Sequence, residues 1–427
     1  MKRNEETFEV EDLPMFRDKS LQWASQFSHA CLFNSNQIDF PYKPFKNLLA
    51  ADRHYVVPFH HRNDFDQLRQ AVDDVGDWLI GHLGYDLKNQ IEPLSSCHFD
   101  LTGFADIAFF QPKHLVFFDH RTVTILTPGS PQEVFKHIQS MDLPTARPRL
   151  DVPVKGLISR SEYIETVERL KDHILEGDIY EINYCMAFFA EHVELDPAQF
   201  YCELVGLSPT PFSSFYKNQD RFALCASPER FLKKTLQKLT SQPIKGTARR
   251  GNSSYEDERI KQRLRTDEKE LAENMMIVDL VRNDLARSCK PGTVAVDEMF
   301  GIYTFKQLHQ MISTVSGTLR EGVHFVEAIK NAFPMGSMTG APKVKVMELI
   351  EQYEKYKRGL FSGSIGYITP EGDFDFNVVI RTLFYEKSLK RASFAVGSAI
   401  TYDSNPANEY EECLLKAAAI SSLLANK

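Results

Sequence analysis

Two pairs of glutamates stand at helical spacing in distant parts of the chain. Glu270 and Glu273 lie in DEKELAENMMIVDLVRND (267–284), and Glu409 and Glu412 lie in NPANEYEECLLKA near the C-terminus. Residues three apart on a helix share one face, with Cβ atoms about 5–6 Å apart. If the two helices converge, four carboxylates would repel one another unless a divalent cation lay between them, and oxygen ligands suit Mg²⁺. The spacing therefore indicates a magnesium site, with two solvated helix faces as the alternative.

One lysine lies in a segment that could carry nucleophilic chemistry. Lys245 stands in SQPIKGTARRG (241–251), between a strand-like run and Gly246, close to Arg249 and Arg250. A lysine attacks carbon only in its neutral form, so this role requires a lowered pKa, which burial and nearby cations provide. The alternative is a loop lysine in water.

Two further cations could bind an anionic substrate. Lys416 follows Glu412 by four residues, which suits either a surface ion pair or a lysine directed at a substrate carboxylate. Arg381 lies in the apolar run FNVVIRTL and, if buried, needs an anionic partner. That partner is either a protein carboxylate or a ligand carboxylate, and both alternatives stay open.

A loop of small residues, one glycine and one histidine are further candidates for binding or acting on a substrate. The loop FPMGSMTGAPK (333–343) opens a predicted helix, where free backbone N–H groups suit an anionic oxygen, although the P-loop spacing is absent. Gly397, in VGSAITYDS, allows close approach of a ligand to the backbone. His309, in FKQLHQMISTVSG, is by default structural, but near a cleft it could orient or protonate a leaving group.

Helical and strand-like segments come in blocks rather than in strict alternation. The periodicity predicts helices over 64–82, 160–177, 255–289, 341–358 and from about Pro406 onward. It predicts a hairpin over 114–127 and strands over 179–190, 211–218, 221–227, 231–236, 238–246, 361–369, 374–385 and 391–402. Such blocks favour an α+β fold with a large antiparallel sheet over a doubly wound sheet.

Composition and charge narrow the class of protein. The chain has 427 residues, of which 43% are hydrophobic and 25% charged, which excludes a disordered chain or a disulfide mini-protein. The net charge of -8 disfavours nucleic acid as a partner, whereas binding of a small anion depends on the local field. Three prolines in 140–153 predict a linker between an N-terminal portion, 1–139, and a larger region, 154–427.

The chain shows no sign of a membrane or secreted protein. Its first residues are acidic and resemble no signal peptide, and no run of about 18 apolar residues occurs. Its seven cysteines form no C-x-x-C pair, so we expect reduced thiols and a cytoplasmic location.

Taken together, the motifs resemble those of the chorismate-utilising enzymes. That family includes anthranilate synthase component I, aminodeoxychorismate synthase component I, and the isochorismate and salicylate synthases. The resemblance covers about residues 155–425 through the motifs GDIYEINY, SPERF, PIKGTARRG, DEKELAENMMIVDLVRND, FKQLHQMISTVSG, GSMTGAPK, SGSIGY, FNVVIRTL and VGSAITYDSNPANEYEECLLKA. It implies two large packed antiparallel sheets with outer helices, the site in a cleft, and a variable N-terminal portion packed on the same fold.

The resemblance also implies residue roles. Glu273 and Glu412 resemble direct Mg²⁺ ligands, and Glu270 and Glu409 resemble helpers that act directly or through water. The groups that resemble those gripping the two carboxylates of chorismate are Tyr367, Arg381, Lys416 and the backbone at Gly397 and Ser398. The residues that line the ring region are Ser337, Thr339 and His309.

Lys245 indicates which activity within this family the chain resembles. Other branches typically read P-I-A-G here, and a lysine resembles the aminodeoxychorismate synthases. The implied reaction is attack of Lys245 on ring carbon 2 with loss of the carbon 4 hydroxyl. Ammonia from a glutamine amidotransferase partner then attacks carbon 4 and expels the lysine. The product, 4-amino-4-deoxychorismate, leads to 4-aminobenzoate and folate. Anthranilate synthase component I is the alternative, and the intact residue set disfavours a non-catalytic scaffold.

Three positions depart from the family pattern. Glu181 stands where glutamine is common and where water-adding members carry lysine, which disfavours water addition. Met335 stands where glycine is expected, which leaves the shape of that loop open. FNSN (33–36) replaces the L-x-E-S pattern of tryptophan-binding members, so tryptophan binding stays open.

Overall fold

The computed structural model describes residues 1–144, 150–306 and 308–425, so part of the predicted linker, 145–149, lies outside the described residues. The helices are α1 Leu13–Ser25, α2 Asp64–Val75, α3 Pro131–Gln139, α4 Arg160–Leu175, α5 Pro197–Leu207, α6 Ser254–Thr266, α7 Glu268–Ala286, α8 Phe325–Ala332, α9 Lys343–Tyr353 and α10 Pro406–Ala425, with short 3-10 turns η1 Tyr85–Gln90 and η2 Gly336–Met338.

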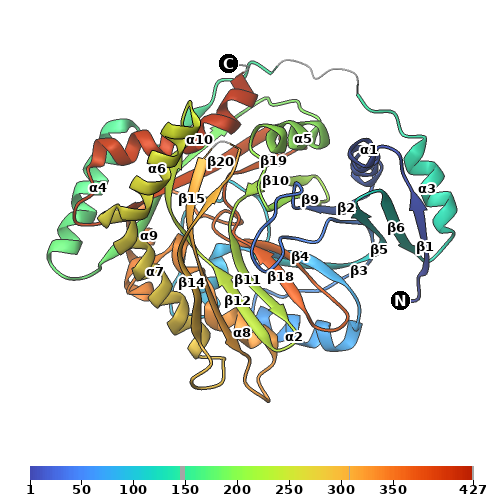
Figure 1. Ribbon diagram of the computed structural model, residues 1–427, viewed down its shortest axis with the longest axis horizontal. Coiled ribbons are helices and arrows are strands. Elements are labelled where there is room, and N and C mark those ends of the chain that lie inside the picture. The colour runs from blue at the N-terminus through green and yellow to red at the C-terminus, as the bar shows by residue number, and fades with distance from the viewer. Residues whose placement is uncertain (145–149, 307, 426–427) are drawn as a thin grey trace.

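The strands lie in the middle of the molecule, with most helices outside them (Figure 1). They are β1 Asn4–Glu9, β2 His29–Asn34, β3 Leu48–Val56, β4 Leu79–Leu83, β5 Ile107–Asp119, β6 Thr122–Thr127, β7 Lys155–Gly156, β8 Glu181–Ala190, β9 Phe212–Asn218, β10 Arg221–Ser227, β11 Arg230–Thr235, β12 Lys238–Gln242, β13 Ile244–Arg249, β14 Ala295–Thr304, β15 Leu308–Thr318, β16 Gly340–Ala341, β17 Ser364–Ile368, β18 Phe374–Asn377, β19 Thr382–Glu386 and β20 Arg391–Ile400.

Antiparallel pairing divides these strands into two sheets that share β5. The first runs β8–β20–β19–β10–β9–β2–β3–β5–β6–β1. The second runs β5–β4–β17–β18–β11–β12–β15, and β15 also pairs with β13 and β14. Rings from the two sheets touch, as Phe33 of β2 and Tyr367 of β17 do at 5.1 Å between centroids. The predicted fold class, α+β with packed antiparallel sheets, is confirmed.

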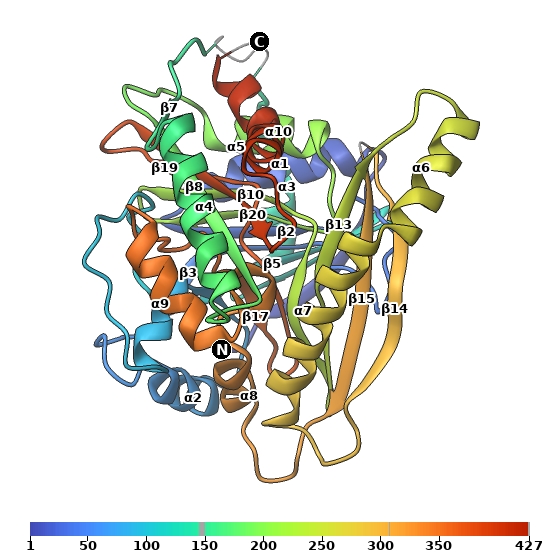
Figure 2. The ribbon, with the colours of Figure 1, turned by 90° about the vertical axis from the view of Figure 1, so that its left-hand side faces the viewer.

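Two apolar clusters hold the layers together. One lies between the sheets and continues under α2, α7 and α8, with members such as Leu83, Phe376 and Ile329. The other lies between the first sheet and the helices α1, α4, α5, α9 and α10, with members such as Tyr184 and Ile420. Figure 2 shows α4, α9 and α10 on one side and α6 and α7 along β13, β14 and β15 on the other.

Strands from the first 139 residues lie inside both sheets. β2 pairs with β9, and β4 pairs with β17, so the N-terminal portion contributes interior strands to the same core as the later region. Within the described residues, no helix combines the length and apolar character needed to cross a bilayer.

The predicted helix over 64–82 is correct only for α2. The chain leaves this helix at Gly76, whose φ of 54° is left-handed, and then forms β4. All five residues of β4 are buried, so the strand lacks the alternation of apolar and polar residues that marks a half-exposed strand.

Two other predicted elements are each divided into two in the structure, next to candidate site residues. The helix predicted over 255–289 divides into α6 and α7 at Asp267, whose carboxylate accepts the backbone N–H of Glu270 and so caps α7. The strand predicted over 374–385 divides into β18 and β19, and Arg381 between them has a left-handed φ of 51°.

Candidate functional site

The four predicted metal ligands lie in the first turns of two helices. α7 packs against β13 and β15, and α10 packs against β20 and α4 (Figure 2). Asp267 caps α7, and the carbonyl oxygen of the Asn405 side chain accepts backbone N–H groups at the start of α10, as the sequence predicts. Each helix therefore begins near the other with an E-x-x-E pair.

The two pairs converge around a lysine. Lys269 Nζ lies 3.0 Å from Oε1 of Glu409 and 3.6 Å from Oε1 of Glu273, so it bridges the two helices. Burial raises the pKa of Glu270, and the charge of Glu412 raises it further. Because carboxylates from both helices influence one another, the interpretation of two unrelated solvated faces is wrong.

The chemistry of these side chains fits a hard cation. Burial raises the pKa of Glu273 to about 7 despite the attraction of Lys245, and Oε1 of Glu273 is buried without a hydrogen-bond partner. Such an oxygen has lost its hydration and retains capacity for a ligand. Among the described residues, three ligand atoms come within 4.8 Å of one another only at His173, Glu176 and Asp178. The glutamates are therefore more widely spaced, which suits Mg²⁺ held by one or two carboxylates and by waters.

Lys245 lies beside this cluster and interacts electrostatically with Glu273. It belongs to β13, and its carbonyl oxygen accepts a hydrogen bond from Asn274 of α7 at 3.3 Å. Gly246 allows this approach, because its φ is 96° and an added Cβ would lie 3.2 Å from Oε2 of Glu270. The Lys245 residue is 8% exposed, so the interpretation of a loop lysine in water is wrong.

The partner of Lys245 is the unusual carboxylate in β8. Lys245 Nζ donates a hydrogen bond to Oε1 of Glu181 at 2.5 Å, and Oε2 of Glu181 is buried without a partner. Burial opposes the charge of Lys245, but Glu181 and Glu273 outweigh it and raise its pKa. The expected lowering of this pKa is therefore wrong for the ligand-free protein. The neighbours are carboxylates, and the cation Arg250 instead pairs with Asp257.

One site residue escaped the sequence analysis. Glu229, in SPERF between β10 and β11, is 4% exposed, and burial raises its pKa to about 7. Ser337, the charge of Lys245, the backbone N–H of Ile244 and the charge of Arg381 all favour its ionised form and limit the rise. A carboxylate directly between two apolar strands was the signal that could have revealed it.

Arg381 interacts electrostatically with this carboxyl. Burial lowers its pKa to about 10, and Glu229 partly opposes that change. Within residues 1–144, 150–306 and 308–425, its guanidinium makes no hydrogen bond or ion pair. Of the two alternatives left open for its partner, this arrangement favours a carboxylate from a ligand.

Lys416 joins the C-terminal helix to β20. Its Nζ lies 2.7 Å from Oε1 of Glu412 and donates to the carbonyl oxygen of Gly397 at 2.9 Å. Glycine is required at 397, because an added Cβ would lie 2.5 Å from Sγ of Cys185. The neighbouring Ser398 is buried, and its hydroxyl lies 2.9 Å from that of Tyr163, under α4. Only the backbone at this point is available to a ligand.

Three predicted residues have no direct contact with the charged cluster. Both ring nitrogens of His309 are occupied, by Asp257 and Thr304, at 2.9 Å each. The hydroxyl of Thr339 donates to carbonyl oxygens within its own turn. The ring of Tyr367 packs between the sheets against Phe33, Phe45 and Trp78. Their predicted roles therefore stay predictions.

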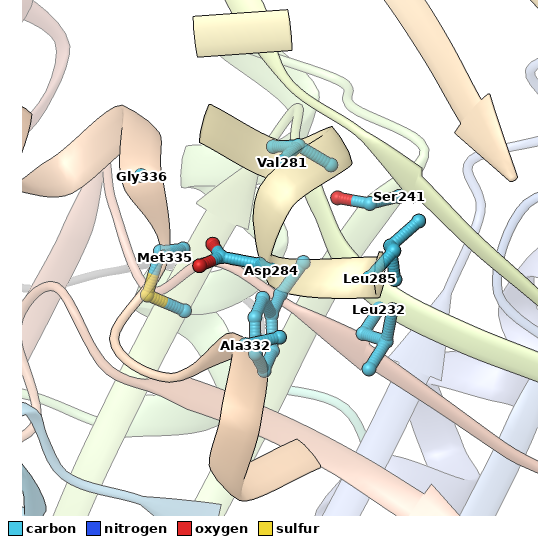
Figure 3. Close-up of a pocket in the computed structure, with 9 residues that line it drawn as sticks. Leu232, Ser241, Val281, Asp284, Leu285, Ala332, Met335 and Gly336 are labelled. Carbon is cyan, nitrogen blue, oxygen red and sulfur yellow. The ribbon is translucent and has the colours of Figure 1, made fainter. Parts of the chain in front are cut away.

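A small pocket lies behind the loop that carries Ser337 (Figure 3). Met335 and Gly336 form one wall and Asp284 of α7 another, with the carboxylate of Asp284 directed toward the loop (Figure 3). Asp284 pairs with Lys343 at 2.7 Å, so α7 is tied to the start of α9. None of the charged residues of the cluster lines this pocket, and Met335, at the unusual position, fills space beside it.

The comparisons with known proteins agree with this fold. The family of chorismate binding enzymes matches residues 28–422. The chain therefore belongs to the chorismate binding enzyme family.

Individual relatives carry two different names. The chain is 36% identical over 355 residues to an anthranilate synthase component I-like protein of Synechocystis sp., covering 82% of this chain and 73% of that protein. It is 35% identical over 388 residues to the chloroplastic aminodeoxychorismate synthase of Arabidopsis thaliana, covering 84% of this chain but 41% of that longer protein. The crystal structure of anthranilate synthase component I from Streptococcus pneumoniae superposes with a TM-score of 0.78 at 26% identity, over 91% of this chain and 95% of that one.

Proposed function

We propose that this chain is the chorismate-aminating component of an aminodeoxychorismate synthase. It would convert chorismate and ammonia into 4-amino-4-deoxychorismate, a precursor of 4-aminobenzoate and folate, in the cytoplasm. The observation that carries this proposal is the position of Lys245, buried against Glu181 and beside the glutamates. A lysine at that point would act as the nucleophile once it has lost a proton.

Binding of chorismate would use two cations, Arg381 and Lys416. Among the described residues Arg381 makes no ion pair, although Glu229 attracts it, and Lys416 can exchange Glu412 for a substrate carboxylate. The backbone of Gly397 allows close approach next to Lys416. Together these groups would orient the ring over Lys245.

Bond making would pass through Lys245 in two displacements. After Lys245 gives a proton to Glu181, its Nζ bonds to ring carbon 2 while the bond from carbon 4 to its hydroxyl breaks. Glu229, with a pKa near 7, would give the departing hydroxyl a proton, so that it leaves as water. Ammonia then bonds to carbon 4 and the bond from carbon 2 to Nζ breaks, which returns the lysine and preserves configuration.

The glutamates would hold Mg²⁺, with Glu273 and Glu412 as direct ligands and Glu270 and Glu409 as helpers. When bound, Mg²⁺ supplies positive charge that draws in the ring carboxylate and stabilises charge developed there. The donor set of four carboxylates supports this assignment, as does Oε1 of Glu273, which is buried without a hydrogen-bond partner.

The ammonia would come from a separate glutamine amidotransferase. The word "component" in the names of the Synechocystis and Streptococcus proteins supports a two-part enzyme. Because ammonia must reach carbon 4, we expect free ammonium salts to replace the partner at sufficient concentration and pH.

The second candidate is anthranilate synthase component I, which the names of those same two relatives favour. One incubation separates the two: the full chain with chorismate, Mg²⁺ and an ammonium salt, analysed by chromatography and by a pyruvate assay. We expect 4-amino-4-deoxychorismate without pyruvate. Fluorescent anthranilate with equimolar pyruvate would establish the second candidate instead.

A further inference from the structure

Lys269 is a charged side chain of the site to which the proposed reaction gives no task. It lies in the first turn of α7, and its ammonium contacts one carboxylate on each helix, Glu409 at 3.0 Å and Glu273 at 3.6 Å. Its side chain is 39% exposed, whereas those of Glu409 and Glu273 are 4% and 7% exposed. The cation therefore reaches from solvent into a nearly buried group of acids.

No other cation can take this place while the present contacts hold. Lys245 donates to Glu181, and Lys416 bonds with Glu412 and the backbone of Gly397. Within the described parts of the chain, Lys269 makes the one ion pair of Glu409. Without this ammonium, the buried carboxylates would be left uncompensated, which is strongly unfavourable.

The same oxygen cannot serve the lysine and a metal ion equally well. A magnesium ion coordinates carboxylate oxygen at about 2.1 Å. Bound to Oε1 of Glu273, it would lie no more than about 6 Å from Lys269 Nζ in its present position. A divalent and a monovalent cation at that separation repel strongly in a site with little water.

We propose that Lys269 is the built-in counter-cation of the glutamate site, and that a divalent metal must displace its ammonium from Glu273 and Glu409 to bind. The inference rests on the proposed magnesium site and adds a residue that sets its affinity. In the metal-free chain, Lys269 keeps the two helices assembled. On metal binding, its flexible stem swings the ammonium toward solvent.

This exchange has a consequence for selectivity. A monovalent ion would replace the lysine without adding charge, whereas a divalent ion adds one positive charge among four carboxylates. Lys269 would therefore exclude sodium and potassium while weakening the affinity for magnesium enough to permit release.

The test measures Mn²⁺ binding to the full chain by the electron paramagnetic resonance signal of free Mn²⁺. The variants are K269M, which keeps the stem without the charge, and K269R, which keeps the charge. K290M is the control, since Lys290 is about as exposed as Lys269 but pairs with an exposed acid, Glu321. We expect K269M to bind Mn²⁺ about tenfold more tightly than the unaltered chain, with K269R and K290M within about twofold of it.

A second measurement does not depend on affinity. Without metal, K269M should melt at a lower temperature than K290M, and Mn²⁺ should raise its melting temperature more than it raises that of the unaltered chain. If K269M does not fold without metal, K269Q gives the same comparison, because its amide can still donate to Glu409.

Equal or weaker Mn²⁺ binding by K269M would overturn the role of Lys269 while leaving the metal site intact. Absence of Mn²⁺ binding in every variant would overturn the metal site and this inference together. Since neither readout involves the reaction product, both results are distinguishable from a failure of the proposed amination.

Discussion

Two groups of buried charges, one around Arg358 and one around Lys245, contact β8 at Asn183 and Glu181 respectively. They differ in how completely their polar atoms are hydrogen-bonded. Arg358 is 1% exposed and makes five hydrogen bonds, to Glu354 twice, Met338, Ser362 and Asn183. Its guanidinium also lies 4.7 Å from the ring centroid of Tyr85. Every N–H of this arginine has a partner, as expected of a charge that supports the fold.

The charged cluster around Lys245 is incomplete by comparison. Oε2 of Glu181 and Oε1 of Glu273 are buried without hydrogen-bond partners, and the guanidinium of Arg381 bonds to no described residue. Burial raises the pKa of two of its carboxyls to about 7. Since unsatisfied buried charges are costly, their concentration here indicates a site that a ligand completes. The following predictions test this contrast, from the largest effect to the smallest.

Replacement of Lys245 by alanine should nearly abolish the reaction. We expect a loss of at least about 10³-fold in product formation, because the covalent step has no other nucleophile. The measurement is 4-amino-4-deoxychorismate formed with saturating ammonium, and circular dichroism is the control for folding. Retention of near-normal turnover would remove Lys245 from the mechanism.

Replacement of Arg358 by methionine should instead damage the fold. It leaves Glu354 buried and uncompensated and frees the carbonyl groups of Met338 and Asn183, so we expect a loss of about 3–5 kcal/mol in the free energy of unfolding. Urea denaturation measures it, with R391M as a control at a partly exposed ion pair. A change below about 1 kcal/mol would contradict the structural role.

The carboxyl of Glu229 should produce a pH dependence near neutrality. Because its pKa is raised to about 7, the protonated form that can donate exists below that pH and is lost above it. We therefore expect kcat/KM to fall on the alkaline side of about pH 7. The variant E229Q should be about 10²-fold slower and lack this limb. If the alkaline limb of the kcat/KM profile is unchanged in E229Q, that limb reports the titration of another group.

The fold could be predicted from the sequence more completely than the site. The antiparallel blocks and the caps Asp267 and Asn405 follow local rules, whereas β4 is buried on both faces and so resembles a helix segment. The glutamate spacing indicated two pairs of acids on helix faces, and these faces converge around Lys269, whereas their role as magnesium ligands stays a prediction. Glu229 was missed because its importance comes from burial and from its electrostatic interaction with Lys245 and Arg381, which are distant in sequence. The pKa of Lys245 was misjudged because the sequence shows adjacent arginines but not the carboxylates that fold against it.

Replacement of Arg381 by methionine should impair substrate binding and leave stability intact, in contrast to R358M. Because the guanidinium makes no hydrogen bond or ion pair with a described residue, and burial opposes its attraction to Glu229, we expect the free energy of unfolding to change by less than about 1 kcal/mol. The KM for chorismate should rise about 10- to 100-fold. Steady-state kinetics and urea denaturation measured on the same preparation decide the matter. A large stability loss with unchanged KM would reverse the assignment.

Replacement of Glu181 by glutamine should have the smallest effect. Glu181 raises the pKa of Lys245, so removal of its charge should lower that pKa and move the acidic limb of the pH profile toward lower pH. We expect the rate at the optimum to change by less than about tenfold, because the amide oxygen still accepts a hydrogen bond from Nζ and, once the pKa of Lys245 is lowered, water can take the proton that Glu181 accepts in the unaltered chain. A shift of the acidic limb toward higher pH would contradict the claim that the charge of Glu181 raises the pKa of Lys245.

The most direct test of the central claim is the mass of the protein after incubation with chorismate and Mg²⁺ in the absence of ammonia. We predict an adduct equal to chorismate minus one water, carried on the peptide that contains Lys245. Addition of an ammonium salt should remove it as 4-amino-4-deoxychorismate appears. Product formed at a normal rate with no adduct on Lys245, or anthranilate and pyruvate in its place, would contradict the account.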